Sequence, residues 1–303
     1  MTRTGAIAAT LIRSALLVVA IALLVFLFLR VIPGDVVDVF AIEGDLTEDQ
    51  AALMRAELGL DAPVWRQLAV WTGDIVSGDL GTSVRYQRPV ADLVASAIPT
   101  TVTVGLGSFA FGVSLAIALA IGAALWPRSV FPLLVNAVNT WSIAVPTFCV
   151  GLIGILVFAI WLRWMPVLGN IWLPIVVIGL DIAGQLVKTL HEELKEATTS
   201  AHIRTAQAKG LHPLRIVVFH LLPTAAPLAL ALSGLVLAGL VGGTLTMEVL
   251  FGLPGVGSLT LNGILGRDYP LIQATLLLLA LAVVVLNGLT DLLHALIDPR
   301  PAQ

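Results

Sequence analysis

The sequence contains little charge for its length. Only 12% of its 303 residues are charged, whereas 58% are hydrophobic. Soluble globular proteins carry about 25% charged residues, which help to cover the surface that faces water. A chain with about half that share cannot cover such a surface, so the composition indicates a polytopic membrane protein. The net charge of -3 gives no reason to expect a nucleic-acid partner.

Other absences exclude several kinds of site. The single cysteine, Cys149, permits no internal disulfide and lies in an apolar run, so we expect a small buried side chain. The sequence has no G-x-x-x-x-G-K-S/T phosphate loop, no H-E-x-x-H zinc motif and no G-x-S-x-G nucleophile motif. We therefore expect no catalytic residue, no metal site and no cofactor bound by this chain.

Charged residues separate six apolar stretches that are each long enough to cross a bilayer. A transmembrane helix needs about 20 mainly apolar residues, and its backbone groups must be paired within the helix. The predicted spans are 11–32, 101–125, 140–162, 171–189, 224–246 and 272–293. The first could be a cleaved signal peptide, but no small-x-small cleavage site follows Arg30, so a retained helix is favoured. The predicted fold class is an all-α integral membrane protein with six transmembrane helices.

The stretch 129–162 leaves the number of crossings open. Its first half carries polar or helix-breaking residues, namely Pro132, Asn136, Asn139, Ser142 and Pro146. We interpret it as an interfacial segment followed by one crossing. One crossing places the basic stretch 188–215 on the same side as Arg3 and Arg13. The positive-inside rule then puts that side, and with it both chain termini, in the cytoplasm.

Three parts follow from this topology. Residues 1–32 are the N-terminus and first transmembrane helix, 33–98 an external cap, and 99–303 the transmembrane core with a cytoplasmic loop at 190–223. The cap holds eleven acidic and four basic residues. Within the cap, 48–58 is predicted as a short helix with Thr47 as its N-cap.

The cytoplasmic loop has a pattern of its own. Residues 198–209 can form a short helix capped by Thr198, Thr199 or Ser200. Gly210 suits a left-handed stop after that helix, and Pro213 suits the first turn of the next. We expect two short helices around a tight turn, with small side chains that let another helix or a groove approach closely.

This loop resembles the coupling motif of binding-protein-dependent ABC importer permeases. In that family an acidic residue and two alanines open the motif, glycine stands at the seventh place, and hydrophobic-x-Leu-Pro closes it. Here the opening is Arg204-Thr205-Ala206, the glycine is Gly210, and the ending is His220-Leu221-Leu222-Pro223. The departures are Arg204, Thr205 and His220. The Arg-Thr-Ala-x-Ala-Lys-Gly form is similar to the peptide/nickel branch.

Segments along nearly the whole chain strengthen this resemblance. They are similar to the first of the two permeases in dipeptide, oligopeptide, glutathione and nickel importers. The segments are Pro33-Gly34-Asp35, 57–63, 78–83, 251–257, 267–273 and Asp298-Pro299-Arg300.

The resemblance implies a permease subunit of the bacterial inner membrane that forms the path for peptides or a related small solute. It implies a second permease subunit in a heterodimer, two ATPase subunits that bind ATP and Mg²⁺, and an extracytoplasmic solute-binding protein. The short helix between transmembrane helices 4 and 5 would dock in a groove of one ATPase. The residues expected to serve that coupling are Arg204, Thr205, Ala206, Lys209, Gly210, His220, Leu222 and Pro223. Charge or bulk at Ala206 or Gly210 is then expected to uncouple ATP hydrolysis from uptake while the protein still inserts.

Charged residues in or beside the spans are candidates for the transport path. Asp181, in the fourth span, could contact a cationic cargo group, form hydrogen bonds within the bundle, or lie near the interface. Glu248, at the end of the fifth span, matches a glutamate of the family and could line the external mouth or make an ordered loop contact. Arg267 and Asp268, in the last external loop, could pair with each other or meet the binding protein.

A stand-alone secondary transporter is the alternative function that the composition allows. Such a transporter would be expected to show several intramembrane charges, or broken helices in paired positions. Asp181 alone supports it weakly, and the structured basic loop would have no role in it.

Overall fold

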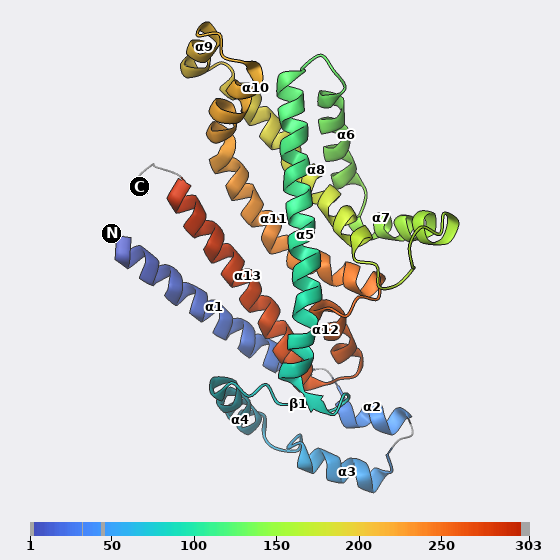
Figure 1. Ribbon diagram of the computed structural model, residues 1–303. Helices are drawn as coiled ribbons and strands as arrows, with labels where there is room; N and C mark the ends of the chain where they lie inside the picture. The colour runs from blue at the N-terminus through green and yellow to red at the C-terminus, as the bar shows by residue number, and fades with distance from the viewer. Residues whose placement is uncertain (1–2, 32, 44–45, 298–303) are drawn as a thin grey trace. The chain divides into compact units, whose positions relative to one another are not determined.

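The computed structural model describes residues 3–31, 33–43 and 46–297, so the predicted match at Asp298-Pro299-Arg300 lies outside the described residues. The chain divides into two compact units. Unit 1 comprises Met1–Pro99 and Pro254–Val284, and unit 2 comprises Thr100–Leu253 and Val285–Gln303. The long helices α5 and α13 each begin in unit 1 and continue into unit 2 (Figure 1).

Unit 1 is built from helices and one short ribbon. Its elements are α1 (Arg3–Val31), α2 (Val36–Glu43), α3 (Glu48–Glu57), α4 (Val64–Ser77), β1 (Thr82–Ser83), β2 (Arg88–Pro89), α12 (Val256–Leu265) and the first parts of α5 (Val90–Leu125) and α13 (Tyr269–Ile297). The predicted helix with Thr47 as its N-cap is confirmed. The Thr47 hydroxyl accepts a bond from the Gln50 amide, and the Gln50 side chain accepts one from the Thr47 amide at 2.8 Å, which is a capping box.

Two apolar clusters hold unit 1 together. In one, Val36 and Val37 of α2 pack with Ala51 of α3 and with Val84, beside the β1–β2 ribbon. In the other, the start of α5 packs against the start of α13, with Leu271 fully buried. Both clusters join segments far apart in sequence, so the cap is a folded part of unit 1 and not a slack loop.

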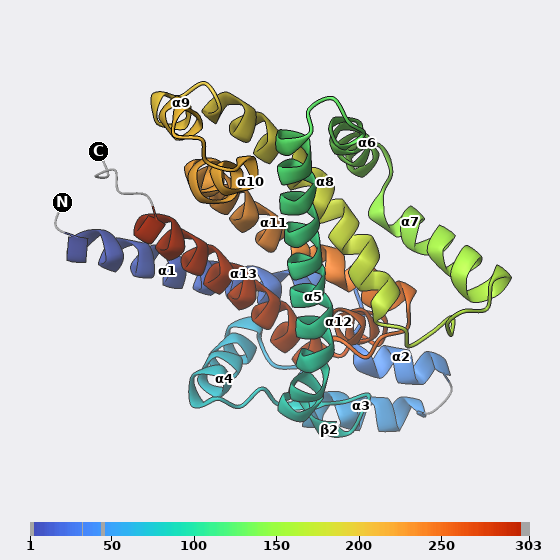
Figure 2. The ribbon, with the colours of Figure 1, turned by 45° about the horizontal axis from the view of Figure 1, so that its top comes forward.

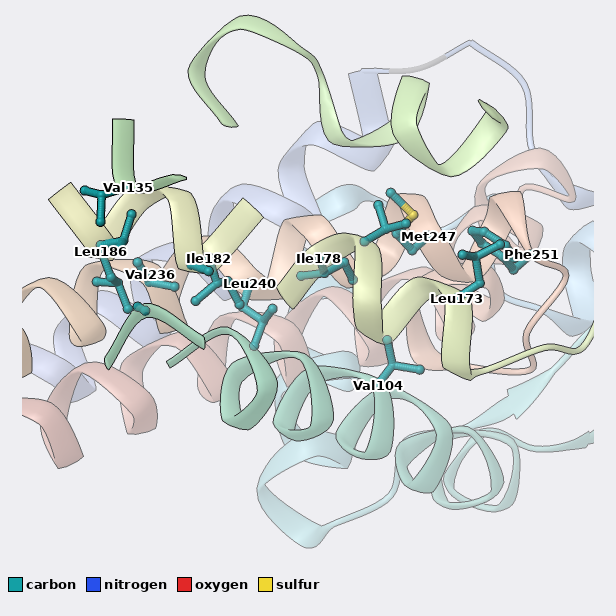
Figure 3. Packing of buried hydrophobic residues seen from close by; sticks show 14 of the residues in the cluster. Val104, Val135, Leu173, Ile178, Ile182, Leu186, Val236, Leu240, Met247 and Phe251 are labelled. Atoms are coloured by element: carbon teal, nitrogen blue, oxygen red, sulfur yellow. The ribbon is translucent and has the colours of Figure 1, made fainter. Parts of the chain in front are cut away.

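Unit 2 is a helical bundle. It contains the rest of α5 and α13 with α6 (Phe131–Ala144), α7 (Thr147–Gly154), the π-helical turn η1 (Ile155–Trp161), α8 (Trp172–Ala197), α9 (Ala201–Ala208), α10 (Pro213–Ile216), the π-helical turn η2 (Val217–Leu221) and α11 (Leu222–Leu250). Its core follows α8, where Ile178, Ile182 and Leu186 lie in one buried cluster with Val104 of α5 and Leu240 of α11 (Figure 3). Apolar packing in the core thus runs along most of α8.

A glycine contact brings two helices of unit 2 close together. A Cβ on Gly112 of α5 would lie 2.6 Å from the carbonyl oxygen of Gly179 on α8, and 2.7 Å from Cβ of Ile182. No side chain larger than hydrogen fits there. Small residues at helix crossings are typical of membrane bundles, where backbone approach supplies the packing energy.

The candidate membrane spans agree with the predicted ones at five places. Among the described residues, the segments long and apolar enough to cross are Ile12–Ile42, Val90–Leu125, Trp172–Ala197, Pro213–Leu250 and Tyr269–Thr290. The predicted crossing at 140–162 is not one continuous helix. Instead α6 and the α7–η1 segment meet at an angle of 100°.

The break between α6 and α7 has a local cause. Val145 adopts an extended backbone and is followed by Pro146, which has no N–H to donate to a preceding turn. The helix therefore stops at Ala144 and restarts at Thr147. This bent pair counts as one broken span or as a re-entrant loop, which gives five or six candidate crossings.

Candidate functional site

The cytoplasmic loop predicted from the sequence forms a helical hairpin of α9 and α10. Ser200 occupies the N-cap of α9, but its hydroxyl donates back to the Ala197 carbonyl at 2.6 Å, so α9 starts without a side-chain cap. Gly210 adopts a φ of 71° and ends α9. Pro213 opens α10 as its first residue. The predicted pair of short helices around a glycine turn is confirmed.

The two faces of α9 have different environments. Ile203 and Ala206 are buried against Leu190 and Leu194 of α8, in a cluster that also includes Ala120 of α5 and Val217 of η2. This face anchors the hairpin to the ends of several long helices of unit 2. Since the anchoring face is apolar and closely packed, a force on α9 is transmitted to those helices and not lost in a flexible loop.

The opposite face of the hairpin is exposed and basic. Arg204, Thr205 and Lys209 are exposed, as are Leu214 and Arg215 of α10. Within the described part of the chain the ion pairs are those of Arg55 with Asp35 and Asp38, so none neutralises this face. An exposed cationic face of this kind can orient a partner surface that carries acidic groups or carbonyl oxygens.

The eight residues expected to serve coupling therefore divide between two locations. Arg204, Thr205, Lys209 and Gly210 lie on the exposed side of the hairpin, and Pro223 is exposed at the start of α11. Ala206 is 4% exposed and belongs to the anchoring face. His220 and Leu222 are half-buried at the junction of η2 and α11. The sequence pattern alone did not separate these faces, although the apolar residue Ile203, three positions before Ala206, is the signal that marks the buried side.

A π-helical turn at the end of the motif was not predicted. Residues Val217–Leu221 widen the helix just before Leu222 and Pro223. Pro223 has no amide hydrogen, which removes one helical donor next to this turn. The Nδ1 atom of His220 is buried there without a hydrogen-bond partner. Single π turns within α-helices are frequent at functional sites, and Pro223 is the sequence signal nearest to this one.

Asp181 lies in a polar seam between α6 and α8. Its carboxylate accepts hydrogen bonds from the Ser142 hydroxyl at 2.7 Å and from the Gln185 amide at 2.9 Å. Asn139 of α6 donates to the carbonyl of Gly184 on α8 at 2.9 Å. Of the three alternatives for Asp181, this geometry matches hydrogen bonding within the bundle. Contact with cargo stays a prediction.

Glu248 is fully buried near the end of α11. The Thr101 hydroxyl of α5 donates a hydrogen bond to its carboxylate at 2.6 Å, and its carbonyl accepts from the Leu253 amide at 2.8 Å. The full burial of Glu248 therefore favours an ordered structural contact over a position that lines the external mouth of the path.

Arg267 and Asp268 do not pair with each other. Asp268 is fully buried and accepts hydrogen bonds from the Ser83 hydroxyl at 2.5 Å and from the Arg85 amide at 3.2 Å. Arg267 has a positive φ of 50° and its guanidinium lies over Gly34. The adjacent charges therefore face different neighbours, and Asp268 secures the β1–β2 ribbon.

Comparison with known proteins decides between the two functions that the sequence left open. Residues 93–303 match the family described as binding-protein-dependent transport system inner membrane component. The chain belongs to this family. It is thus a permease of the ABC importer type and a multi-pass membrane protein, which favours that reading over a stand-alone secondary transporter.

Two relatives extend the similarity beyond the matched family region. A protein of Brucella suis named as a peptide transport system permease is 31% identical over 293 residues, covering 92% of this chain and 93% of its own length. The glutathione transport system permease protein GsiC of Escherichia coli is 33% identical over 285 residues, covering 92% of each chain.

A solved structure shows the same fold at lower sequence similarity. A chain of the MetNI methionine ABC transporter, in an inward-facing conformation, aligns with a TM-score of 0.57 and 19% identity. The alignment covers 68% of this permease and 96% of that chain.

Proposed function

We propose that this permease forms, with a second permease subunit, the membrane path of an importer for peptides or related small solutes. An extracytoplasmic binding protein would deliver the cargo, and two ATPase subunits would bind ATP and Mg²⁺ and drive transport. The names of the relatives, which refer to peptide and glutathione transport, support this cargo class. Nickel complexes stay within the proposal only through the resemblance of the sequence motifs.

The observation that carries the proposal is the two-faced α9–α10 hairpin. Its apolar side, with Ile203 and Ala206, is packed onto the ends of α5 and α8, and its cationic side is exposed. A motor subunit that binds the exposed side would therefore move the long helices when it closes on ATP. Rigid rocking of such helices can expose a central path alternately to each side of the membrane.

The orientation of the chain follows from the same hairpin. If it docks on a cytoplasmic ATPase, the loop 190–223 faces the cytoplasm, as do both termini. The basic residues of this loop and of the N-terminus agree with that orientation by the positive-inside rule.

Charge reversal on the exposed face tests the proposal. The double variant Arg204→Glu, Lys209→Glu replaces two exposed basic side chains with acidic ones. Neither residue belongs to the buried cluster that anchors the hairpin. We expect normal membrane levels of the permease, but loss of co-purified ATPase subunits and a fall in peptide uptake of about tenfold or more, since like-charge contact at an interface costs several kcal/mol. Uptake is measured in vesicles with labelled dipeptide and purified binding protein.

The matched control is Arg128→Glu. Arg128 is also exposed and is predicted to be cytoplasmic, but it belongs to the turn between α5 and α6 and not to the hairpin. It should leave uptake and ATPase retention unchanged. If the double variant retains its ATPase subunits and transports at the rate of the control, the proposed coupling surface is wrong.

A further inference from the structure

Unit 1 contains a pocket of about 750 Å³ that the transport mechanism does not use. Its walls come from the end of α1, from the α3–α4 region and from the start of α13, and they include Arg30, Gln67, Trp71, Tyr269 and Gln273. Figures 1 and 2 both place α4 beside the end of α1. The rings of Phe26 on α1 and Trp71 on α4 are 5.3 Å apart, which fixes this wall.

Arg30 brings a positive charge to this pocket. Its guanidinium carbon lies 4.7 Å from the centroid of the Phe26 ring and 4.7 Å from that of Tyr269. Its Nε and Nη1 atoms are buried and have no hydrogen-bond partner. Among the described residues no carboxylate pairs with Arg30. A guanidinium keeps its charge at any physiological pH, and the two rings compensate only part of the cost of burying it.

A second donor in the same pocket also lacks a partner. Gln273 is only 4% exposed, and its Nε2 atom makes no hydrogen bond. Gln67, in the same pocket, donates from Nε2 to the carbonyls of Leu60 and Ala62 at 3.0 and 2.8 Å, and its buried Oε1 atom is an acceptor without a hydrogen-bond partner, against three such donor atoms on Arg30 and Gln273. The inner part of the pocket therefore has an excess of N–H donors, and a ligand that satisfies them must supply acceptor oxygens.

Apolar surface next to the pocket indicates where such a ligand comes from. Several large side chains on the last turns of the transmembrane helix α1 are exposed, namely Leu23, Leu24, Leu27 and Phe28. On α4, Trp65, Val70 and Val76 are exposed as well. A hydrophobic helix that ends in arginine, beside an amphipathic helix with tryptophan, is typical of the level of lipid headgroups. Acyl chains can lie along α1 while the headgroup reaches Arg30.

The rim of the pocket carries the opposite charge. Asp61, Asp74 and Asp79 line it and are exposed, together with Arg66. Acceptors at the rim and donors inside complement a headgroup that has a phosphate and an ammonium group. We propose that this pocket binds a zwitterionic phospholipid, with its phosphate on Arg30 and Gln273 and its ammonium group near the rim carboxylates.

Lipid binding to the purified transporter complex tests this proposal without any need for transport. The complex is placed in nanodiscs of phosphatidylethanolamine, phosphatidylglycerol or phosphatidylcholine, and tightly held lipids are counted by native mass spectrometry. We expect wild type to retain the two zwitterionic lipids, phosphatidylethanolamine and phosphatidylcholine, in preference to phosphatidylglycerol, and Arg30→Gln to weaken retention about 10- to 100-fold, as expected for a lost charge-assisted bond. Gln273→Leu should weaken it less. The control Arg88→Gln changes an exposed arginine of β2 outside the pocket and should retain the lipid.

Three outcomes would overturn the proposal. The wild-type complex could retain no lipid in any of the three nanodiscs. This outcome is read from the wild type alone, so it does not depend on whether a variant folds. Arg30→Gln could retain as much lipid as Arg88→Gln. Added dipeptide or inorganic phosphate could displace the lipid at concentrations that leave other bound lipids in place, which would assign the donors to a free carboxylate or phosphate instead.

Discussion

The Thr101 hydroxyl donates a 2.6 Å hydrogen bond to the fully buried carboxylate of Glu248, which joins α5 to α11 in unit 2. The two residues are 147 positions apart in the sequence. A buried carboxyl group is costly unless it is hydrogen-bonded, so this contact stabilises the helix pair.

The first prediction concerns this contact. Thr101→Val keeps the shape of the side chain but removes the donor, so the buried carboxyl group of Glu248 loses this hydrogen bond, at a cost of about 1–3 kcal/mol. We expect a lower melting temperature of the purified complex, measured by intrinsic fluorescence. Thr246→Val is the control, because Thr246 is exposed on α11 and its hydroxyl bonds only to the Gly242 carbonyl of the same helix. Equal melting temperatures for the two variants would contradict the stabilising role.

The second prediction separates a structural from a cargo-binding Asp181. Because Ser142 donates to Asp181, the single changes Ser142→Ala and Asp181→Asn should not add, and a double-mutant cycle should give a coupling energy of about 0.5–3 kcal/mol in unfolding experiments. Uptake of neutral and cationic dipeptides should fall in the same proportion. A loss confined to cationic dipeptides would instead place Asp181 on the transport path.

Local sequence signals predicted the parts of the fold that depend on neighbouring residues. The capping box at Thr47, the left-handed Gly210 and Pro213 at the start of α10 each follow from backbone rules that act within a few positions. The apolar stretches likewise predicted where five candidate spans lie, although α5 starts at Val90, well before the predicted 101.

Features that depend on contacts across the fold could not be predicted in this way. That Asp268 faces Ser83 and not Arg267 depends on a hydrogen bond between residues 185 positions apart. That Ala206 is buried depends on where α9 packs against α8. The 100° bend after Ala144 is an intermediate case, because Pro146 signals a break but the angle is set by packing.

The third prediction revises the expected effect of charge at Ala206. Since Ala206 is buried in the anchoring cluster, Ala206→Asp would place a carboxylate among Ile203, Leu194 and Val217. We expect it to destabilise the permease by several kcal/mol and to lower its level in the membrane, because an unpaired buried charge is costly. Immunoblots of membrane fractions measure that level. The neighbouring change Thr205→Asp, on the exposed side, is the control and should leave the level normal. If the Ala206→Asp protein is present in the membrane at a normal level but uptake is lost, Ala206 acts on the surface that binds the ATPase and not in the anchoring cluster.

The last prediction concerns the buried Asp268. Its carboxylate accepts from Ser83 and from the Arg85 amide, and so it fixes the β1–β2 ribbon to the turn before α13 within unit 1. Asp268→Ala removes the Oδ2 atom that accepts both bonds and leaves a buried hydroxyl and a backbone amide without this acceptor, at a cost of about 1–3 kcal/mol each. We expect the ribbon to open more often, so trypsin should cleave after Arg85 faster than in the unchanged protein. Ser77→Ala is the control, since the exposed Ser77 bonds only to the Asp74 carbonyl in its own helix. If Asp268→Ala is cleaved no faster than this control, Asp268 does not fix the ribbon.

Arg267→Gln should also leave cleavage unchanged, because Arg267 shares no bond with Asp268. Faster cleavage in that variant would indicate an ion pair between the two residues.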